Sequence, residues 1–235
     1  MWRAGWQGKR PMIGFKILQR PRAVSADVVE RFRRLPVANV SDNMARMFAG
    51  GARLRPIYAG GTMSGPALTV KTRPGDNLLV HKAIMMAEPG DIIVVDAGGD
   101  LTNAIIGEIM VTEAEVAKVG GFVIDGAIRD SGTLKSGSFP VFAAGVTHRG
   151  PYKDGPGEIN VPIAIDGMVI NPGDLILGDD DGIVCVAYED VEEIYAATVK
   201  KHAIEEQSLI DIRAGKRSKQ WVDDALKRLG CEIHS

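Results

Sequence analysis

Residues 91–99 read DIIVVDAGG, and this stretch decides the fold class. A short apolar run that stops at an aspartate and two glycines is typical of a buried strand that opens into a loop. Residues 121–125, GFVID, and 140–144, PVFAA, predict two further buried strands, and residues 77–87 and 102–118 have helical patterns. Because strands and helices alternate along this region, the sequence predicts an α/β fold with a parallel component.

The regions on either side of this alternating part have different patterns. Residues 1–22 contain two Trp, four Arg and two Lys without periodicity, and predict an arm over the surface or on a neighbouring subunit. We expect Ser25 to cap a first helix and a second helix to follow Ser41. Residues 150–187 predict short strands and turns. The expected parts are an N-terminal arm at 1–22, an α/β domain at 23–188, and C-terminal helices at 189–235 that pack on the core or on a neighbouring subunit.

The tripeptide Pro-Gly-Asp occurs three times, beginning at Pro74, Pro89 and Pro172. Proline followed by glycine suits the two central positions of a type II turn. We therefore expect tight turns here, two of which lead directly into apolar strands. Residues 178–182, GDDDG, predict a hairpin turn, because they lack the alternating oxygen ligands and the closing glutamate of an EF-hand loop.

The composition restricts the partners and the compartment. The chain has 28 Lys and Arg against 30 Asp and Glu, a net charge of −2, which argues against a nucleic-acid or membrane surface. Cys185 and Cys231 form no Cys-x-x-Cys motif or Cys/His cluster, which predicts a reduced, cytoplasmic compartment and no structural zinc site. We expect no signal peptide and no membrane segment, since the apolar runs fall far short of the roughly 20 residues that span a bilayer.

The residues that can carry chemistry follow the predicted strands, where α/β sheets bind ligands. Arg129 and Asp130 stand just past the strand at 121–125, and Glu108 precedes them by about one strand-loop unit. Arginine can recognise a carboxylate or polarise a carbonyl oxygen, and aspartate is a hard oxygen ligand for Mg²⁺ or Mn²⁺. An Arg-Asp pair alone also fits a surface ion pair. Proximity to Glu108 across adjacent parallel strands favours a site. The chain has neither Gly-x-Gly-x-x-Gly nor Gly-x-x-x-x-Gly-Lys, so no nucleotide loop is expected.

With these residues in view, the chain resembles the regulator of ribonuclease activity A-like (RraA-like) family. This family includes class II pyruvate aldolases for 4-hydroxy-4-methyl-2-oxoglutarate and 4-carboxy-4-hydroxy-2-oxoadipate. The resemblance runs from about residue 35 to residue 187. The motifs that carry it are GDNLLVHKAI, PGDIIVVDAGGD, AIIGE, GGFVIDGAIRD, PVFAAG and PGDLILGDDDGIV.

The resemblance implies a swivelling β/β/α-type core with helical N- and C-terminal extensions, assembled as a homotrimer or a dimer of trimers with the site between subunits. It implies that Asp130 binds Mg²⁺ or Mn²⁺, that Arg129 contacts the keto oxygen of pyruvate, and that Glu108 orients a water molecule. Further polar groups are expected around the cleft, some from the neighbouring subunit. They are Asp42, Lys153 and Glu205. The backbone amides expected to hold the substrate carboxylate are those of Gly107, Glu108, Ile109 and Met110.

The activity implied is that of a metal-dependent lyase acting on a 2-keto acid, by retro-aldol cleavage or by decarboxylation of oxaloacetate through the same pyruvate enolate. The family aldolases usually carry an acid three places after the metal-binding aspartate, where this chain has Thr133. The alternative is a non-catalytic protein that binds and inhibits an RNA-processing enzyme, as the family's namesake does. Retention of Glu108, Arg129 and Asp130 favours the enzyme, because a binding surface has no physical need for that trio.

Overall fold

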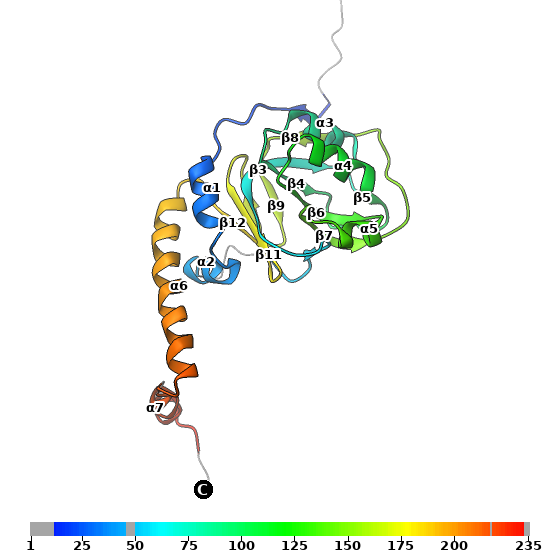
Figure 1. Cartoon of the computed structure of the whole chain (residues 1–235). Coiled ribbons are helices and arrows are strands. Elements are labelled where there is room, and N and C mark those ends of the chain that lie inside the picture. Colours follow the sequence, from blue (N-terminus) through cyan, green and yellow to red (C-terminus); the bar gives the residue numbers. More distant parts are fainter. Residues whose placement is uncertain (1–11, 46–49, 217, 233–235) are drawn as a thin grey trace, which may run out of the picture.

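The computed structural model describes residues 12–45, 50–216 and 218–232. Within these ranges, the main sheet has ten strands, and its centre is formed by β3 (Met63–Thr72), β4 (Ile92–Asp96), β6 (Gly121–Ile128) and β7 (Val141–Val146). These four neighbours pair in parallel, in that order (Figure 1). The α/β fold with a parallel component is confirmed, and the three predicted buried strands are β4, β6 and β7.

The other strands extend the sheet around this centre. β5 (Ala104–Ile106) pairs in parallel with β6, and β8 (Gly157–Ile159) pairs antiparallel with β3. The short strand β1 (Phe15–Ile17), which lies in the predicted arm, pairs in parallel with β8. The remaining strands are β2 (Arg55–Pro56) on β7, β11 (Leu175–Asp179) on β3, β12 (Gly182–Val186) on β11, and the separate pair β9 (Ile163–Ile165) and β10 (Met168–Ile170).

The helices form two groups at opposite sides of the molecule (Figure 1). One group is α3 (Leu78–Met86), α4 (Glu108–Val116) and α5 (Ser131–Ser136). The other is α1 (Ala26–Phe32), α2 (Val37–Asn43) and α6 (Val191–Arg213), with α7 (Gln220–Arg228) at the far end of α6. In the part of the chain that the structure describes, no helix combines the length and apolar character needed to cross a membrane.

The core explains why the sequence of β4 is continuously apolar. Ile93 and Val95 belong to a buried cluster shared with α3 and α4. Ile92 and Val94 point to the opposite face and belong to a cluster shared with β9 and β10. Successive side chains of a strand alternate between faces, so a strand covered on both sides is apolar at every position. A third cluster packs α1 and α2 on β11 and β12.

Among the predicted helix starts, the one at Ser25 is confirmed and two others are wrong. Ser25 caps α1 as expected, with its Oγ accepting from the Val28 N–H at 3.3 Å. The second helix, however, begins at Val37 and not after Ser41, because Pro36 supplies an extended N-cap and the Val37 N–H bonds to the Asp179 carboxylate at 2.9 Å. The helix predicted at 102–118 begins only at residue 108, since 104–106 pair with β6 as the buried strand β5.

The three Pro-Gly-Asp turns are confirmed. Their glycines adopt positive φ angles of 74°, 90° and 89° at Gly75, Gly90 and Gly173. The aspartates that follow, Asp76, Asp91 and Asp174, are all buried and accept backbone N–H groups. The hairpin predicted at 178–182 is also confirmed, with Asp179 opposite Gly182 between β11 and β12.

Candidate functional site

A cavity of about 290 Å³ lies beside the carboxyl ends of β5 and β6 and the first turn of α4. Its walls come from four separate parts of the chain: the start of α3, the β5–α4 junction, Arg129 after β6, and the segment before β8. The lining residues are Asn77, His81, Ile105, Ile106, Gly107, Ile109, Met110, Arg129, Gly150, Pro151 and Lys153. Five of the predicted site residues are therefore on its wall.

Strand pairing brings Glu108 to Arg129 and Asp130, as the sequence suggested. The Arg129 N–H donates to the Ile106 carbonyl at 3.0 Å, which extends the β5–β6 pairing to the end of both strands. The Glu108 N–H donates to Asp130 Oδ2 at 2.9 Å. Asp130 has a φ of 56°, in the left-handed region that aspartate tolerates better than most residues. This turn aims its carboxylate at the beginning of α4.

Glycine is needed at position 107 because a side chain there would clash with its neighbours, and not because of its backbone conformation. Its φ of −157° is extended backbone that any residue adopts. A Cβ at this position would lie too close to Asp130 Oδ2 and only 2.8 Å from Arg129 Cγ. The sequence suggested Gly107 only as an amide donor. Its second role, which is to leave room for the two side chains, follows from the fold.

Arg129 and Asp130 face the same region and are weakly paired. Arg129 Nε lies 3.7 Å from Asp130 Oδ2, and the two side chains are 40% and 39% exposed. The guanidinium also extends toward the opposite wall, since a Cβ on Gly150 would lie 3.5 Å from Arg129 Nη1. An ion pair of this length and exposure leaves the arginine able to contact an anion in the cavity.

The first turn of α4 provides backbone donors beside that arginine. The first N–H groups of a helix have no partner inside the helix. The Glu108 N–H is used by Asp130, and Ile109 and Met110 follow it on the cavity wall. A helix start favours negative charge, so this position suits a carboxylate.

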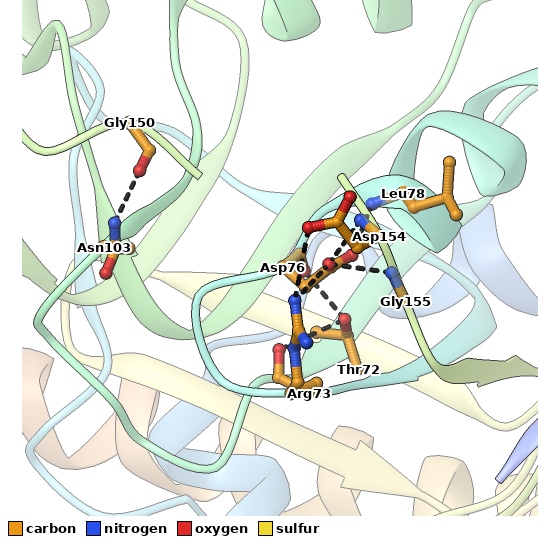
Figure 2. A network of polar contacts seen from close by, with 8 residues as sticks. All are labelled: Thr72, Arg73, Asp76, Leu78, Asn103, Gly150, Asp154 and Gly155. Carbon is orange, nitrogen blue, oxygen red and sulfur yellow. Dashed lines mark hydrogen bonds and ion pairs between the residues drawn. The ribbon is translucent and has the colours of Figure 1, made fainter. Parts of the chain in front are cut away.

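The opposite wall is the segment 149–155, which contains Lys153. Figure 2 shows how two side chains hold this segment: Asn103 Nδ2 donates to the Gly150 carbonyl at 2.6 Å, and Asp76 accepts from the Asp154 and Gly155 N–H groups, both at 2.8 Å. Lys153 lies between these anchors and lines the cavity.

Two polar side chains that line the cavity, Asn77 and His81, were missed from the sequence. Asn77 is buried and donates to the Ile105 carbonyl at 2.9 Å, which joins the start of α3 to β5. His81 has its Nδ1 3.7 Å from Glu113 Oε2 on α4. No pattern in the sequence links His81 to the other site residues, and only the packing of α3 against α4 shows that His81 reaches the cavity.

Asp42 and Glu205 lie elsewhere in the chain. Both carboxylates contact Lys201 Nζ, at 3.0 Å and 3.1 Å, between α2 and α6. The hydrogen bond with Asp42, followed by that with Glu205, raises the pKa of Lys201. These helices are on the other side of the molecule from α4 and α5 (Figure 1). That they lie around the cleft, with some of these polar groups coming from the neighbouring subunit, stays a prediction.

The donor set near Asp130 fits a mostly hydrated divalent cation. Among the described residues, no group of three or more His, Cys, Asp and Glu side chains is arranged to hold a metal ion. Mg²⁺ usually keeps several water ligands and binds through one or two carboxylates, so a partly exposed aspartate suffices as its protein ligand. Thr133, on α5 after Asp130, offers a hydroxyl and no second charge.

Comparison with known proteins identifies the family. A family model described as RraA-like, Aldolase/RraA, matches residues 37–185. The chain belongs to the RraA-like family. A member from Halalkalibacterium halodurans, named "Putative 4-hydroxy-4-methyl-2-oxoglutarate aldolase", is 41% identical over 180 residues, covering 77% of this chain and 86% of that protein.

Solved structures show the RraA-like fold. An uncharacterized protein from Pseudomonas syringae superposes with a TM-score of 0.76 and 25% identity, covering 84% of this chain and 98% of the other. RraAS2 from Streptomyces coelicolor, described as an unusual member of the RNase ES inhibitor RraA protein family, gives 0.73 and 25%, covering 80% and 98%. The family therefore contains proteins named as aldolases and proteins named as inhibitors.

Proposed function

We propose that this RraA-like protein is a divalent-metal-dependent lyase that cleaves a 4-hydroxy-2-keto acid through a pyruvate enolate, as a class II pyruvate aldolase. Oxaloacetate decarboxylation passes through the same enolate and is expected at the same site. One observation carries the proposal: Arg129 and the first turn of α4 line one cavity, and the Asp130 carboxylate lies beside them, bonded to the Glu108 N–H and 3.7 Å from Arg129 Nε. The aldolase name of the relative at 41% identity supports it.

The pyruvate half of the substrate fits the β5–α4 side of the cavity. The N–H groups of Ile109 and Met110 would bind the carboxylate, because the helix start presents donors and a partial positive charge there. Arg129 would contact the keto oxygen and stabilise the negative charge that develops on it as the bond between C3 and C4 breaks. Asp130 would hold Mg²⁺ or Mn²⁺, which supplies additional positive charge for the enolate.

Cleavage also requires two proton movements. The C4 hydroxyl must lose its proton as the new carbonyl forms, and C3 of the enolate must gain one to give pyruvate. Glu108 stands at the first turn of α4, where its backbone N–H is fixed by Asp130. We propose that its carboxylate orients the water molecule that exchanges these protons.

The assembly is proposed to be a homotrimer or a dimer of trimers. The long helix α6 extends away from the sheet (Figure 1), and it carries apolar side chains that are about half exposed, namely Ile204, Leu209 and Ile210. Subunit contacts along α6 would cover them. Mass measurement by light scattering after gel filtration tests this, with three or six chains expected and a monomer contradicting it.

A second candidate is a non-catalytic regulator that binds an RNA-processing enzyme. The likeness to RraAS2, at a TM-score of 0.73, favours it. The two candidates differ at the cavity. Substitutions at Arg129 abolish function in the lyase, whereas a binding protein would tolerate them wherever its contact surface lies outside the cavity.

The decisive variants are Arg129→Ala and Asp130→Asn. Arg129→Ala should abolish pyruvate release from 4-hydroxy-4-methyl-2-oxoglutarate while leaving the thermal midpoint nearly unchanged, because the side chain is 40% exposed. Full activity in this variant would overturn the assignment. Asp130→Asn should lose both the activity and its dependence on added Mg²⁺ or Mn²⁺. A variant that kept both would place the metal elsewhere.

A further inference from the structure

We propose that Asp76 is a positioning residue of this site, which fixes the wall that carries Lys153. The inference rests on the proposed function for its kinetic consequence, and on contacts within the chain for its structural part. Asp76 belongs to the first Pro-Gly-Asp turn and is not on the cavity wall. It acts through the two segments that it joins.

The carboxylate of Asp76 is fully buried and is surrounded by donors (Figure 2). Oδ2 accepts from the backbone N–H groups of Asp154 and Gly155, both at 2.8 Å, and pairs with Arg73 at 3.0 Å. Oδ1 accepts from the Leu78 N–H at 3.0 Å. A buried carboxylate with four donors has little freedom to move, and each of its bonds is charge-assisted.

These bonds immobilise the chain on both sides of Lys153. After it, the Asp154 and Gly155 amides are held by the carboxylate. Before it, Tyr152 exchanges two backbone bonds with the same turn: its N–H donates to the Gly75 carbonyl at 2.8 Å, and its carbonyl accepts from the Asn77 N–H at 3.0 Å. The position of Lys153 at the cavity is therefore set largely by the turn at 74–76.

The same carboxylate sets a second wall of the cavity. Its bond to the Leu78 N–H fixes the beginning of α3, and Asn77 and His81 from that beginning line the cavity. One buried group thus fixes the distance between α3 and the segment with Lys153. Loss of its charge is expected to loosen both walls while leaving Arg129, on the β6 side, in place.

The chain contains a matched control in the third Pro-Gly-Asp turn. Asp174 is also buried, and it accepts from the Asn171 N–H at 2.8 Å and from the Tyr188 N–H at 3.0 Å. Neither of these partners lies at the cavity. Asp76→Asn and Asp174→Asn make the same chemical change in the same kind of turn. Only the first changes bonds to segments that line the cavity.

The test combines hydrogen exchange with kinetics on the full chain. In Asp76→Asn, the backbone amides of residues 152–155 should exchange at least about tenfold faster, because a neutral amide cannot accept from all of these donors. KM for 4-hydroxy-4-methyl-2-oxoglutarate should rise by about tenfold, with a smaller change in kcat. Asp174→Asn should lower the thermal midpoint without either effect.

Two results would overturn the proposal. One is unchanged exchange at 152–155 in Asp76→Asn, and the other is the same rise in KM in both variants. If Asp76→Asn does not fold, Asn103→Ala removes only the bond from a half-buried side chain to the Gly150 carbonyl, and it should raise KM in the same direction. An unchanged KM in Asn103→Ala would also count against the proposal. A wild-type protein without lyase activity would refute the proposed function, whereas the exchange comparison would still decide the structural role of Asp76.

Discussion

Substitution of Gly107 by alanine tests whether the geometry of the site matters separately from the fold. The added methyl group would lie 2.8 Å from Arg129 Cγ and closer still to Asp130 Oδ2. Ordinary contacts begin at 3.4 Å. The two side chains must therefore move by about 0.6–1 Å, and the bond from the Glu108 N–H to Asp130 must lengthen or break.

The expected loss can be stated for activity and for stability. A displacement of about 1 Å in a catalytic constellation costs on the order of 10²-fold in rate, so kcat/KM should fall by 10–100-fold. The atoms that must move belong to partly exposed side chains and not to backbone. Unfolding free energy should therefore fall by only about 1–2 kcal/mol, which corresponds to a few degrees in the thermal midpoint.

The assay is pyruvate release at saturating Mg²⁺, combined with thermal unfolding of the same preparations. Gly132→Ala is the matched control, because a Cβ there meets no atom within 4 Å and alanine favours the helix in which it lies. Wild-type kcat/KM in Gly107→Ala would refute the reasoning. So would an equal loss of activity in both variants.

Three further outcomes are expected. Burial, followed by the charges of Asp180 and Asp179, raises the pKa of Tyr58 to about 12. The stability that the neutral phenol contributes is then complete below about pH 10 and is lost as the pH rises toward 12. In a titration followed by phenolate absorbance, Tyr58 should ionise last, and Tyr58→Phe should remove that final step. Simultaneous titration of all tyrosines would contradict this. Ellman's reagent should label the exposed Cys231 quickly and the buried Cys185, whose pKa burial raises, only on unfolding; a fast thiol that survives in Cys231→Ser would be inconsistent. Lys153→Ala should raise KM by about tenfold without changing the thermal midpoint, and an unchanged KM would remove Lys153 from the site.

The sequence predicted the part of the fold that depends on local pattern. The continuous apolar runs of β4 and β6 identified parallel strands buried on both faces. The sequence also predicted that adjacent parallel strands bring Glu108 close to Arg129, and in the structure the strand that does so is β5. β5 itself was missed, because three apolar residues next to a helix fit a helical pattern equally well. Its pairing with β6 shows that these residues form a strand.

The far wall of the cavity could not be predicted in this way. It depends on Asp76, which accepts hydrogen bonds from the backbone N–H groups of Asp154 and Gly155. These two residues come 78 and 79 positions later in the chain. His81 likewise reaches the cavity only through the packing of α3 beside α4. Local patterns identify helices and turns, but they do not specify which turn meets which loop. Conversely, Asp42 and Glu205 are ion-paired with Lys201 within the chain, so any part in the site depends on the assembly of subunits.

The most direct test of the account is pyruvate release from 4-hydroxy-4-methyl-2-oxoglutarate by the purified protein, measured with Mg²⁺, with EDTA, and in Arg129→Ala. The account predicts release well above the metal-only background in the wild type, with no release in EDTA or in the variant. Equal release by the wild type and Arg129→Ala, or none above background from either, would contradict the assignment of this cavity as a lyase site.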